Sequence, residues 1–354
     1  MKRQTRQVWV GTVPIGGGAA VSIQSMCNTD TRDVEATVRQ IDDLAALGCQ
    51  IVRVAVPDAP SAAALGAIRK RIGIPLVADI HFDYKLALLA LEQGVDKLRI
   101  NPGNIGGAER VRAVAQAASE RDIPIRIGVN GGSLSRQMLR KYGGPTAEAM
   151  VESALAEVGL LETFHFENIV ISLKGSSVPR TVEACRQLAR RCDYPLHIGV
   201  TEAGAGSEAL IKSAVGVGAL LLDGIGDTVR VSITGDPLQE IGAAEQILRA
   251  AGVRDTGIQI ISCPTCARTG GDILAVIEAL KRRLPPSKQS LTVAVMGCAV
   301  NGPGEAREAD LGAAFGPSHC VLFVKGEKLR SVPHEQVLDE LLALIDELLA
   351  ERSE

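Results

Sequence analysis

The chain has few aromatic residues, no excess of basic residues and no long apolar run. Its 38 basic and 41 acidic residues give a formal net charge of -3, so it lacks the positive charge that would neutralise nucleic-acid phosphates. No stretch approaches the ~18 apolar residues of a membrane-spanning helix. The N-terminal MKRQTRQVWVGTVPIGGG starts with basic residues, but Gly, Thr and Pro interrupt its apolar part, so it makes a poor signal peptide. We therefore expect a soluble, cytoplasmic protein.

The chain contains eight cysteines, which without an export signal should be reduced thiols or metal ligands rather than disulfides. Two of them, Cys263 and Cys266, are separated by two residues in ISCPTCART, and Cys298 follows some thirty residues later in MGCAVNGPGEA. This spacing is typical of a metal site built from thiolates. The other five show no ligand spacing, and we interpret them as small buried apolar side chains. They are Cys27, Cys49, Cys185, Cys192 and Cys320.

Branched aliphatic residues abound while aromatic residues make up only 3%, a balance typical of parallel-sheet interiors. Short β-branched segments recur eight times within roughly 250 residues, each followed by a stretch with apolar residues at helical spacing that ends at Gly. This alternation predicts a (β/α)₈ barrel. An open doubly wound sheet is the alternative, but no glycine-rich turn follows the first strand. The predicted strands are 20–26, 50–56, 74–80, 96–103, 124–130, 168–174, 195–204 and 228–236, with a hairpin at 8–16 closing the barrel floor.

The pattern changes after about residue 250, so we divide the chain into a barrel domain at 1–250 and a compact α+β domain at 251–354. The second domain should contain two strands that run into the cysteine loops, two further short strands, and two helices. The last helix, within 334–351, carries an apolar stripe that we expect to pack on its own sheet.

Reactive side chains of such a barrel lie at the C-terminal ends of its strands. The predicted strand ends carry five cations, and each arginine could pair with a carboxylate as scaffolding. Five on different strands, with only Asp79 and Glu202 prominent nearby, instead favour an anionic ligand. Because arginine binds phosphate bidentately, at roughly 1.5–3 kcal/mol for each bond, we interpret these strand ends as a site for a small molecule such as a diphosphate. The cations are Arg53, Arg99, Arg126, Lys174 and Arg230, and the same strand ends carry His81, Asn101, Asn130 and Ser232.

Three cysteines leave the metal site one ligand short of four. Structural zinc would be completed by His319 or Cys320. Glu305, seven positions after Cys298, is a weaker ligand, which would suit an exchangeable position on one iron of an iron–sulfur cluster. Two other functions stay open from the residues alone: a zinc-stabilised barrel aldolase with Lys174 as its Schiff base, and a non-enzymatic iron–sulfur carrier, in which the barrel cations would have no use.

The motifs SCPTCAR and MGCAVNGPGEA, preceded by SIQSM, ADIHF, RINPGN and GVTEAG, together resemble the 4-hydroxy-3-methylbut-2-enyl diphosphate synthases of the methylerythritol phosphate pathway to isoprenoids. The resemblance runs from about residue 5 to the end and fits the two-domain bacterial form, although Ala267 stands where the family has Gly. It implies two-electron reductive ring opening of 2-C-methyl-D-erythritol 2,4-cyclodiphosphate, with loss of water, to 4-hydroxy-3-methylbut-2-enyl diphosphate. It also implies a [4Fe-4S] cluster and electrons from flavodoxin or ferredoxin.

The resemblance further implies a role for individual residues. Glu202 matches an acidic residue that assists protonation, and Asp79 and His81 fall in a family motif without an assigned role. The implied cluster ligands are Cys263, Cys266, Cys298 and Glu305, the last also acting in catalysis. The implied diphosphate ligands are Arg53, Arg99, Arg126, Asn130, Lys174, Arg230 and Ser232.

The connection between the two domains, at about residues 245 to 257, is short. It leaves the barrel near the end of its last helix, on the outside of the strands. At ~3.3 Å per extended residue it can hardly carry the second domain round to the C-terminal ends of the strands. We therefore predict a two-fold homodimer in which each cluster domain caps the partner's barrel, and the resemblance points the same way.

Overall fold

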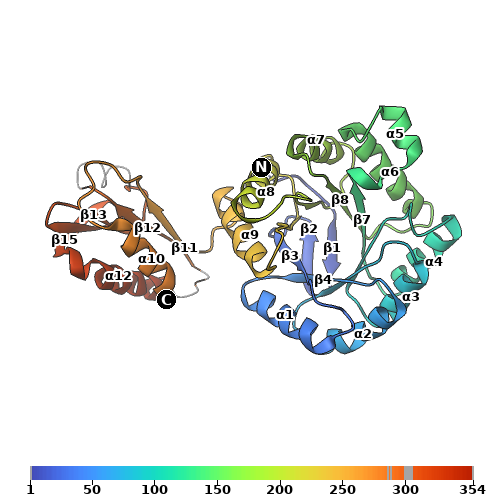
Figure 1. The fold of residues 1–354 in the computed structure, drawn as a ribbon, viewed down its shortest axis with the longest axis horizontal. Coiled ribbons are helices and arrows are strands. Elements are labelled where there is room, and N and C mark those ends of the chain that lie inside the picture. Colours follow the sequence, from blue (N-terminus) through green and yellow to red (C-terminus); the bar gives the residue numbers. More distant parts are fainter. Residues whose placement is uncertain (1, 285–286, 288, 299–305, 353–354) are drawn as a thin grey trace. The chain divides into compact units, whose positions relative to one another are not determined.

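The computed structural model describes residues 2–284, 287, 289–298 and 306–352. It divides into two compact units, the first extending to Arg254 and the second beginning at Asp255 (Figure 1). We refer to them as the barrel unit and the cysteine unit. Within the described ranges, no helix combines the length and apolar character needed to cross a membrane.

Eight parallel strands form the centre of the barrel unit (Figure 1). They are hydrogen-bonded in the order β8-β7-β6-β5-β4-β3-β10-β9. A bridge between Ile171 of β8 and Leu196, which immediately precedes β9, closes this row into a barrel and confirms the predicted fold. The strands are β3 (Ser22–Met26), β4 (Ile51–Ala55), β5 (Leu76–Asp79), β6 (Lys97–Ile100), β7 (Ile125–Asn130), β8 (Ile169–Lys174), β9 (His197–Ile198) and β10 (Thr228–Val229).

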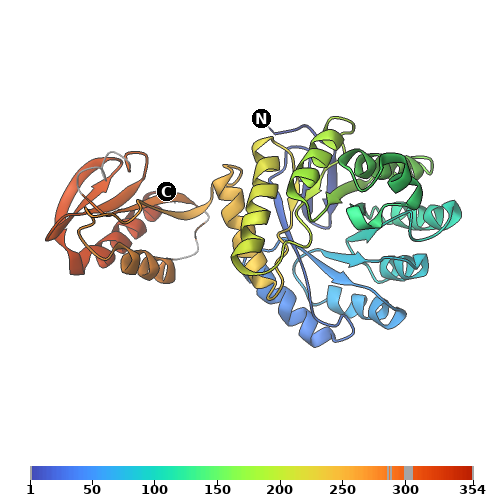
Figure 2. The same cartoon turned by 45° about the horizontal axis from the view of Figure 1, so that its top comes forward.

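Helices surround the strands on the outside of the barrel (Figure 2). Several begin at an aspartate whose carboxylate accepts a hydrogen bond from a backbone N–H of the first turn, as Asp33, Asp58 and Asp83 do. The β7–β8 connection carries two helices. The helices are α1 (Val34–Ala46), α2 (Ala59–Arg69), α3 (Tyr84–Glu92), α4 (Ala108–Ser119), α5 (Arg136–Tyr142), α6 (Ala147–Glu162), α7 (Val178–Ala189), α8 (Gly206–Leu222) and α9 (Leu238–Ala250).

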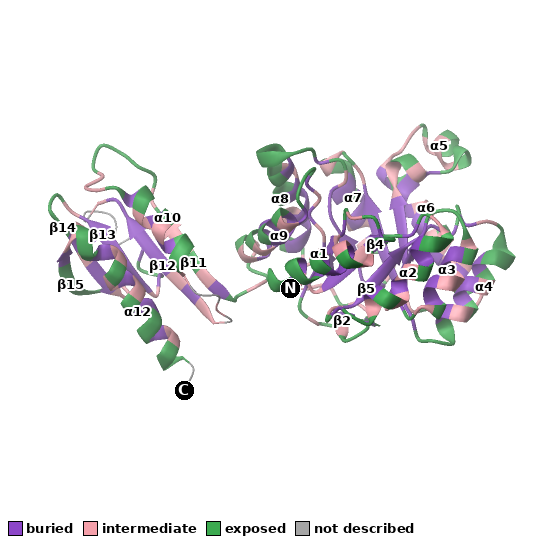
Figure 3. Ribbon diagram, turned by 60° about the horizontal axis from the view of Figure 1, so that its bottom comes forward, coloured by how far each residue is buried: buried purple, intermediate pink, exposed green. Residues whose placement is uncertain are grey.

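A hairpin of β1 (Gln7–Val10) and β2 (Val13–Gly16) closes the N-terminal end of the barrel. Its Val10 and Ile15 are fully buried in one cluster with Ile51 of β4 and Val77 of β5. The predicted floor is therefore confirmed. The main apolar core lies between the strands and the surrounding helices. Figure 3 shows the barrel strands largely in purple, the colour of buried residues.

The last two barrel strands are much shorter than predicted. Residues 195–204 and 228–236 were expected as strands, whereas β9 and β10 contain two residues each. Gly204 and Gly235 adopt φ values of 100° and 134°, so the far ends of the predicted ranges cannot belong to strands. The strands themselves end earlier, at Ile198 and Val229, and Glu202 and Ser232 lie on loops beyond these ends.

The cysteine unit is built on one five-stranded sheet in the order β11-β12-β13-β14-β15. The first three strands are parallel and the last two antiparallel to their neighbours. The sheet contains five strands where four were predicted, and its edge strand β15 is largely exposed and charged, without apolar alternation. The strands are β11 (Gly257–Ser262), β12 (Ser290–Met296), β13 (Leu311–Phe315), β14 (His319–Val324) and β15 (Glu327–Pro333).

The two faces of this sheet differ. Helices α10 (Ile273–Arg283) and α12 (Val337–Glu351) share the apolar core of one face, which confirms that the last helix packs on its own sheet. The other face holds a smaller cluster, and Cys263 packs against it. The residues of this alanine cluster are Ala294, Met296, Ala306, Ala309, Ala314 and Phe323.

Candidate active site

Asp79, at the end of β5, holds two of the predicted arginines. Its carboxylate accepts a hydrogen bond from Arg99 Nη1 at 3.1 Å and lies 3.8 Å from Arg53 Nε. His81 Nε2 lies 3.3 Å from the same carboxylate. Burial alone would raise the pKa of Asp79, but the charges of both arginines and the hydrogen bond with His81 hold it well below its usual range. Asp79 is therefore an ionised anchor for Arg53 and Arg99.

Arg126 lies on β7, and only 2% of it is exposed. Its Nη1 donates to Ser172 Oγ at 3.0 Å, while its Nε and Nη2 are buried with no partner among the described residues. Burial lowers the pKa of Arg126 strongly, and the neighbouring Arg53 and Arg99 add to this effect. A buried guanidinium with unused donors is costly unless an anion binds to it. Arg126 is therefore the arginine in this group with the strongest requirement for an anionic ligand.

Arg230, directly after β10, pairs with a carboxylate that sequence reasoning missed. Its Nη2 lies 3.3 Å from Oε1 of Glu240, a side chain in the first turn of α9 that is 3% exposed. An acidic residue in a first helical turn is ordinary, so the sequence offered no signal for this role. Two carboxylates, Asp79 and Glu240, thus partly neutralise three arginines, which are Arg53, Arg99 and Arg230.

Two lysines also lie in the barrel interior. Lys174 ends β8 and is 5% exposed, and a Cβ placed on Gly199 would lie only 2.7 Å from its Nζ. Lys97, which sequence reasoning also missed, begins β6, is fully buried, and donates to Gln24 Oε1 at 3.2 Å. Burial lowers the pKa of both lysines well below the ordinary value, and nearby arginines contribute. The four arginines Arg53, Arg99, Arg126 and Arg230 by themselves outnumber the carboxylates Asp79 and Glu240.

The remaining predicted barrel residues lie at or beyond the strand ends. Asn130 ends β7 and is half-buried, and Ser232 is half-buried on the loop after β10. Asn101, directly after β6, is buried. Glu202 is exposed and has φ 56°, an unfavourable conformation for a residue with a side chain, and such strain is concentrated at functional sites.

A cavity of about 260 Å³ opens beside Asp79 and His81. Its other walls are largely apolar and come from the loops after β4 and β5, including Val56, Pro57 and Phe82. Asp79 and His81 give this small cavity polar groups, but none of the candidate cations is among its lining residues.

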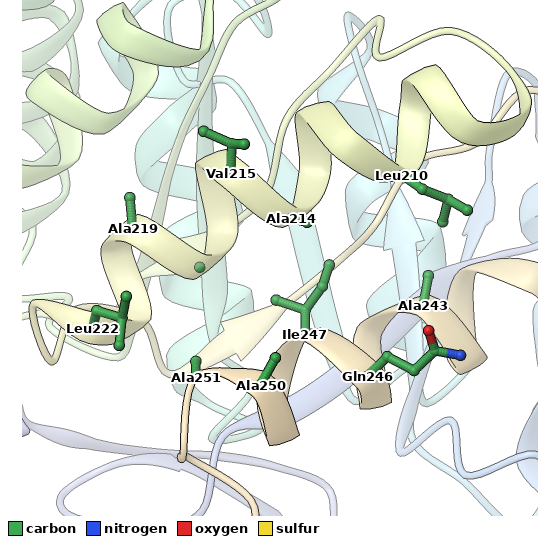
Figure 4. A pocket seen from close by; sticks show the side chains of 11 residues that line it. Leu210, Ala214, Val215, Ala219, Leu222, Ala243, Gln246, Ile247, Ala250 and Ala251 are labelled. Carbon is green, nitrogen blue, oxygen red and sulfur yellow. The ribbon is translucent and has the colours of Figure 1, made fainter. Parts of the chain in front are cut away.

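A separate groove of about 560 Å³ lies between α8 and α9 on the outside of the barrel (Figure 4). Leu210, Val215, Leu222 and Ile247 line it, and no charged side chain is among its lining residues. This groove does not suit a diphosphate.

In the cysteine unit, the strand register brings two cysteine loops together. Ser262 of β11 pairs with Val295 of β12, so Cys263 and Cys298 follow neighbouring parallel strands at one edge of the sheet. The backbone N–H of Gly297 donates to Cys263 Sγ at 3.1 Å. Hydrogen bonds from Arg268 lower the pKa of the exposed Cys266 thiol, and the bond from the Arg268 backbone N–H has the largest effect. Donors that favour thiolates are typical surroundings of a thiolate-bound metal or cluster.

Glu305 lies outside the described residues. Ala306, which follows it, is fully buried in the alanine cluster against which Cys263 packs. Cys320 is buried on the opposite face of the sheet, with α10 and α12, and burial raises its pKa to about 12. His319 is exposed, and its Nδ1 lies 3.0 Å from Ser318 Oγ. Between residues 2 and 352, apart from the undescribed positions, no three His, Cys, Asp or Glu side chains are arranged to hold a metal ion.

Four of the five cysteines predicted to be buried and apolar are buried, namely Cys27, Cys49, Cys185 and Cys320, whereas Cys192 is partly exposed. Burial raises the pKa of the thiols of Cys27 and Cys185 to about 12. These two are inert thiols rather than reactive groups.

Two family models match the chain. The GcpE TIM-barrel domain matches residues 5–245, and the GcpE protein C-terminal domain matches residues 259–347. Among the relatives, the 4-hydroxy-3-methylbut-2-en-1-yl diphosphate synthase (flavodoxin) of Geobacter sulfurreducens is 58% identical over 99% of this chain and 100% of its own length. The protein of the same name from Fusobacterium nucleatum is 51% identical over the full length of both chains.

Solved structures resemble the barrel only in fold. Dihydropteroate synthase from Stenotrophomonas maltophilia aligns with a TM-score of 0.54 at 14% identity, over 70% of this chain and 97% of its own. The N-acetylneuraminic acid synthetase of Leptospira borgpetersenii aligns with a TM-score of 0.50 at 13% identity. The alignment covers 80% of this chain and 100% of the synthetase.

Proposed function

The chain belongs to the GcpE family of 4-hydroxy-3-methylbut-2-en-1-yl diphosphate synthases, and we propose on that basis how its two units share the family's reaction. The reaction is the two-electron reductive ring opening of 2-C-methyl-D-erythritol 2,4-cyclodiphosphate to 4-hydroxy-3-methylbut-2-enyl diphosphate, with loss of water. The observation that carries the proposal is the buried excess of cations at the barrel mouth, in a chain that matches its relatives over its full length.

The barrel mouth binds the cyclic diphosphate. Asp79 and Glu240 neutralise only part of the charge around them, and Arg126 has no carboxylate at all among the partners that the structure describes. A diphosphate supplies the missing negative charge, and each charge-assisted bond contributes about 1.5–3 kcal/mol. We assign the substrate to Arg53, Arg99, Arg126, Asn130, Lys174, Arg230 and Ser232.

Family membership implies an iron–sulfur cofactor, which we propose is a [4Fe-4S] cluster. Cys263, Cys266 and Cys298 would hold it as thiolates, and the hydrogen bonds at Cys263 and Cys266 fit that role. Glu305 would complete the ligands, since Ala306 is packed in the same cluster as Cys263. When bound, the cluster supplies two electrons from flavodoxin, the donor named for the relatives, or from ferredoxin.

Proton delivery is assigned to Glu202. The hydroxyl group that is lost needs a proton to leave as water, and a carboxylic acid at the mouth can supply it. The φ of 56° at Glu202 fits a side chain held in place for a function. Arg126 and Lys174 hold the diphosphate end in the barrel while the carbon skeleton reacts.

We further propose a homodimer with active sites shared between chains. Arg254 anchors the end of the barrel unit, donating from Nη2 to the Val21 carbonyl at 2.7 Å and lying 3.3 Å from Gln50 Oε1. Val21 and Gln50 immediately precede β3 and β4, so the chain leaves the barrel at its floor. Only two residues separate Arg254 from β11. The second chain of a two-fold dimer can bring its cysteine loops to the mouth instead.

The alternatives lose their support. A zinc-stabilised aldolase using Lys174 and a non-enzymatic iron–sulfur carrier do not fit a chain that matches these synthases from end to end. We also propose a cytoplasmic location, where the buried thiols of Cys27, Cys49, Cys185 and Cys320 stay reduced.

The test is anaerobic purification followed by spectroscopy and turnover. Brown protein with about four irons per chain, which converts the cyclic diphosphate when given reduced flavodoxin, is the expected result. Colourless protein with one bound zinc and no turnover would contradict the proposal.

Glu305→Ala tests the fourth ligand separately. We expect partial cluster assembly, slow turnover and faster bleaching in air, because three thiolates hold the cluster but leave one iron open. Absorption spectra and iron content over time measure this. Wild-type activity and air stability in this variant would show that another group completes the site.

A further inference from the structure

Glu240 makes three hydrogen bonds that connect different parts of the barrel. Its Oε2 accepts from Ser25 Oγ at 2.9 Å. Its Oε1 accepts from the backbone N–H of Ile233 at 3.2 Å and lies 3.3 Å from Arg230 Nη2. One buried carboxylate therefore joins β3, the end of β10 and the loop that follows β10.

These contacts determine how Arg230 is presented. The Nη2 of Arg230 faces Glu240, whereas its Nε is buried with no partner among the described residues. Glu240 also accepts the hydrogen bond of the Ile233 N–H, and Ile233 follows Ser232 in the chain. The same carboxylate therefore holds the backbone segment that carries the Ser232 hydroxyl. It leaves the buried Nε of Arg230 available for an anion, as far as the described residues show.

A purely helical role for Glu240 does not account for these bonds. An acidic side chain in a first helical turn interacts favourably with the helix dipole, but it needs no burial for that. Glu240 is 3% exposed, and its partners lie on β3, at the end of β10 and on the following loop. Glu245, on the same helix, is a natural comparison because it pairs with Arg254 at the barrel floor.

We propose that Glu240 is a positioning residue for the substrate diphosphate, which orients Arg230 and the Ser232 loop and so sets substrate affinity. The inference rests on the proposed function of the barrel mouth. It assigns Glu240 to binding rather than to the chemical step, because the diphosphate end of the substrate stays bound throughout the reaction. The loss of Glu240 should therefore raise KM and leave kcat nearly unchanged.

The experiment measures binding of the cyclic diphosphate and of inorganic diphosphate by calorimetry, with KM and kcat measured in parallel. The proteins are the cluster-loaded wild type, Glu240→Gln, Arg230→Met, the double variant of both, and Glu245→Gln as control. We expect Glu240→Gln to weaken binding about tenfold, which is the loss of one charge-assisted bond. The double variant should bind within about twofold of Arg230→Met, because Glu240 acts through Arg230. Glu245→Gln should bind like the wild type.

The outcomes separate the inference from the function on which it rests. If the wild type binds neither ligand, the proposed function fails and the inference with it. If the wild type binds and Glu240→Gln matches it, only the inference fails. It also fails if the losses of Glu240→Gln and Arg230→Met multiply in the double variant, or if Glu245→Gln is equally weakened.

Ser25→Ala keeps the test decisive should Glu240→Gln not fold. This change removes one hydrogen bond to the carboxylate and leaves its charge in place. We expect binding about two- to threefold weaker in the wild-type background and no further loss in the Arg230→Met background. Unchanged binding in the wild-type background, or an equal loss in both, would overturn the inference.

Discussion

In the barrel unit the candidate ligand-binding cations lie on paired strands or, for Arg230, directly after one, and are buried or half-buried. In the cysteine unit the three cysteines lie on loops, and Cys266 is exposed. Asp79 and Glu240 hold three of the arginines through ion pairs within the barrel unit. The cysteine loops are joined by backbone hydrogen bonds such as that from Gly297 to Cys263. On the function that we propose, the barrel mouth is a preorganised anion site, and the cluster would hold the thiolates of the cysteine loops together.

The largest expected effect comes from removing a cluster ligand. Cys298→Ser should lose the cluster and all measurable turnover but keep wild-type affinity for inorganic diphosphate, because the contacts that shape the barrel site lie within the barrel unit. Absorption spectra, iron content and calorimetry measure these properties. Cys192→Ser, at a cysteine outside both sites, should keep cluster, turnover and binding. Loss of diphosphate binding together with the cluster would show that the two sites are not independent.

A mixed dimer tests whether the two sites cooperate across chains. Glu202→Gln damages the barrel site and Cys298→Ser the cluster site, so each homodimer should be inactive. Random co-expression should restore about a quarter of wild-type activity, because half of the dimers are mixed and one of their two sites combines an intact barrel with an intact cluster. Native mass spectrometry confirms that mixed dimers have formed. Their continued inactivity would refute the shared site.

Two arginine substitutions distinguish a paired cation from an unpaired one. Arg126→Met and Arg99→Met should each weaken diphosphate binding about 10- to 150-fold, with the cluster spectrum intact. The two substitutions should change the melting temperature in opposite directions. Arg126→Met removes a buried charge that has no carboxylate partner among the residues described, and should raise the melting temperature by about 2–4 °C per kcal/mol gained. Arg99→Met removes a partner of buried Asp79 and should lower it. Equal shifts in thermal melts would contradict this distinction.

The smallest expected effect is on the pH dependence of barrel stability. Glu157 of α6 has a buried Oε2 without a partner among the described residues, and burial raises its pKa to about 8. The unfolded carboxyl titrates near ~4.3, so the folded state retains a proton that the unfolded state has lost between these pH values. The associated stability is fully present below about pH 4 and is lost as the pH rises through 8.

Glu157→Gln should therefore flatten this decline and melt several degrees above the wild type at pH 8. Melting curves between pH 5 and 9 measure the slope. Glu148→Gln changes an exposed carboxylate on the same helix and should leave the slope unchanged. A wild-type slope in Glu157→Gln would mean that other groups cause the decline.

The accuracy of the sequence predictions depended on whether a feature was local. The eight strand–helix alternations and the C-terminal apolar stripe were visible because burial imposes a regular spacing on neighbouring residues. The lengths of β9 and β10 were overpredicted, since the β-branched pattern continues past Ile198 and Val229, where strand pairing ends. The cysteine unit has one strand more than predicted, and its exposed edge strand β15 buries too little to leave an apolar pattern.

The sequence by itself determined the barrel, the residues at its strand ends, the spacing of the cysteines and the family, because strand ends and short motifs are local and specific. Only the tertiary structure decided which charges meet. Glu240 reaches Arg230 and Ser25 from a neighbouring helix, and Lys97 points inward from the start of its strand. It also placed Cys320 and Cys263 on opposite faces of one sheet. Such pairings join residues up to some 215 positions apart, and they arise from barrel closure and strand register, which no local spacing encodes.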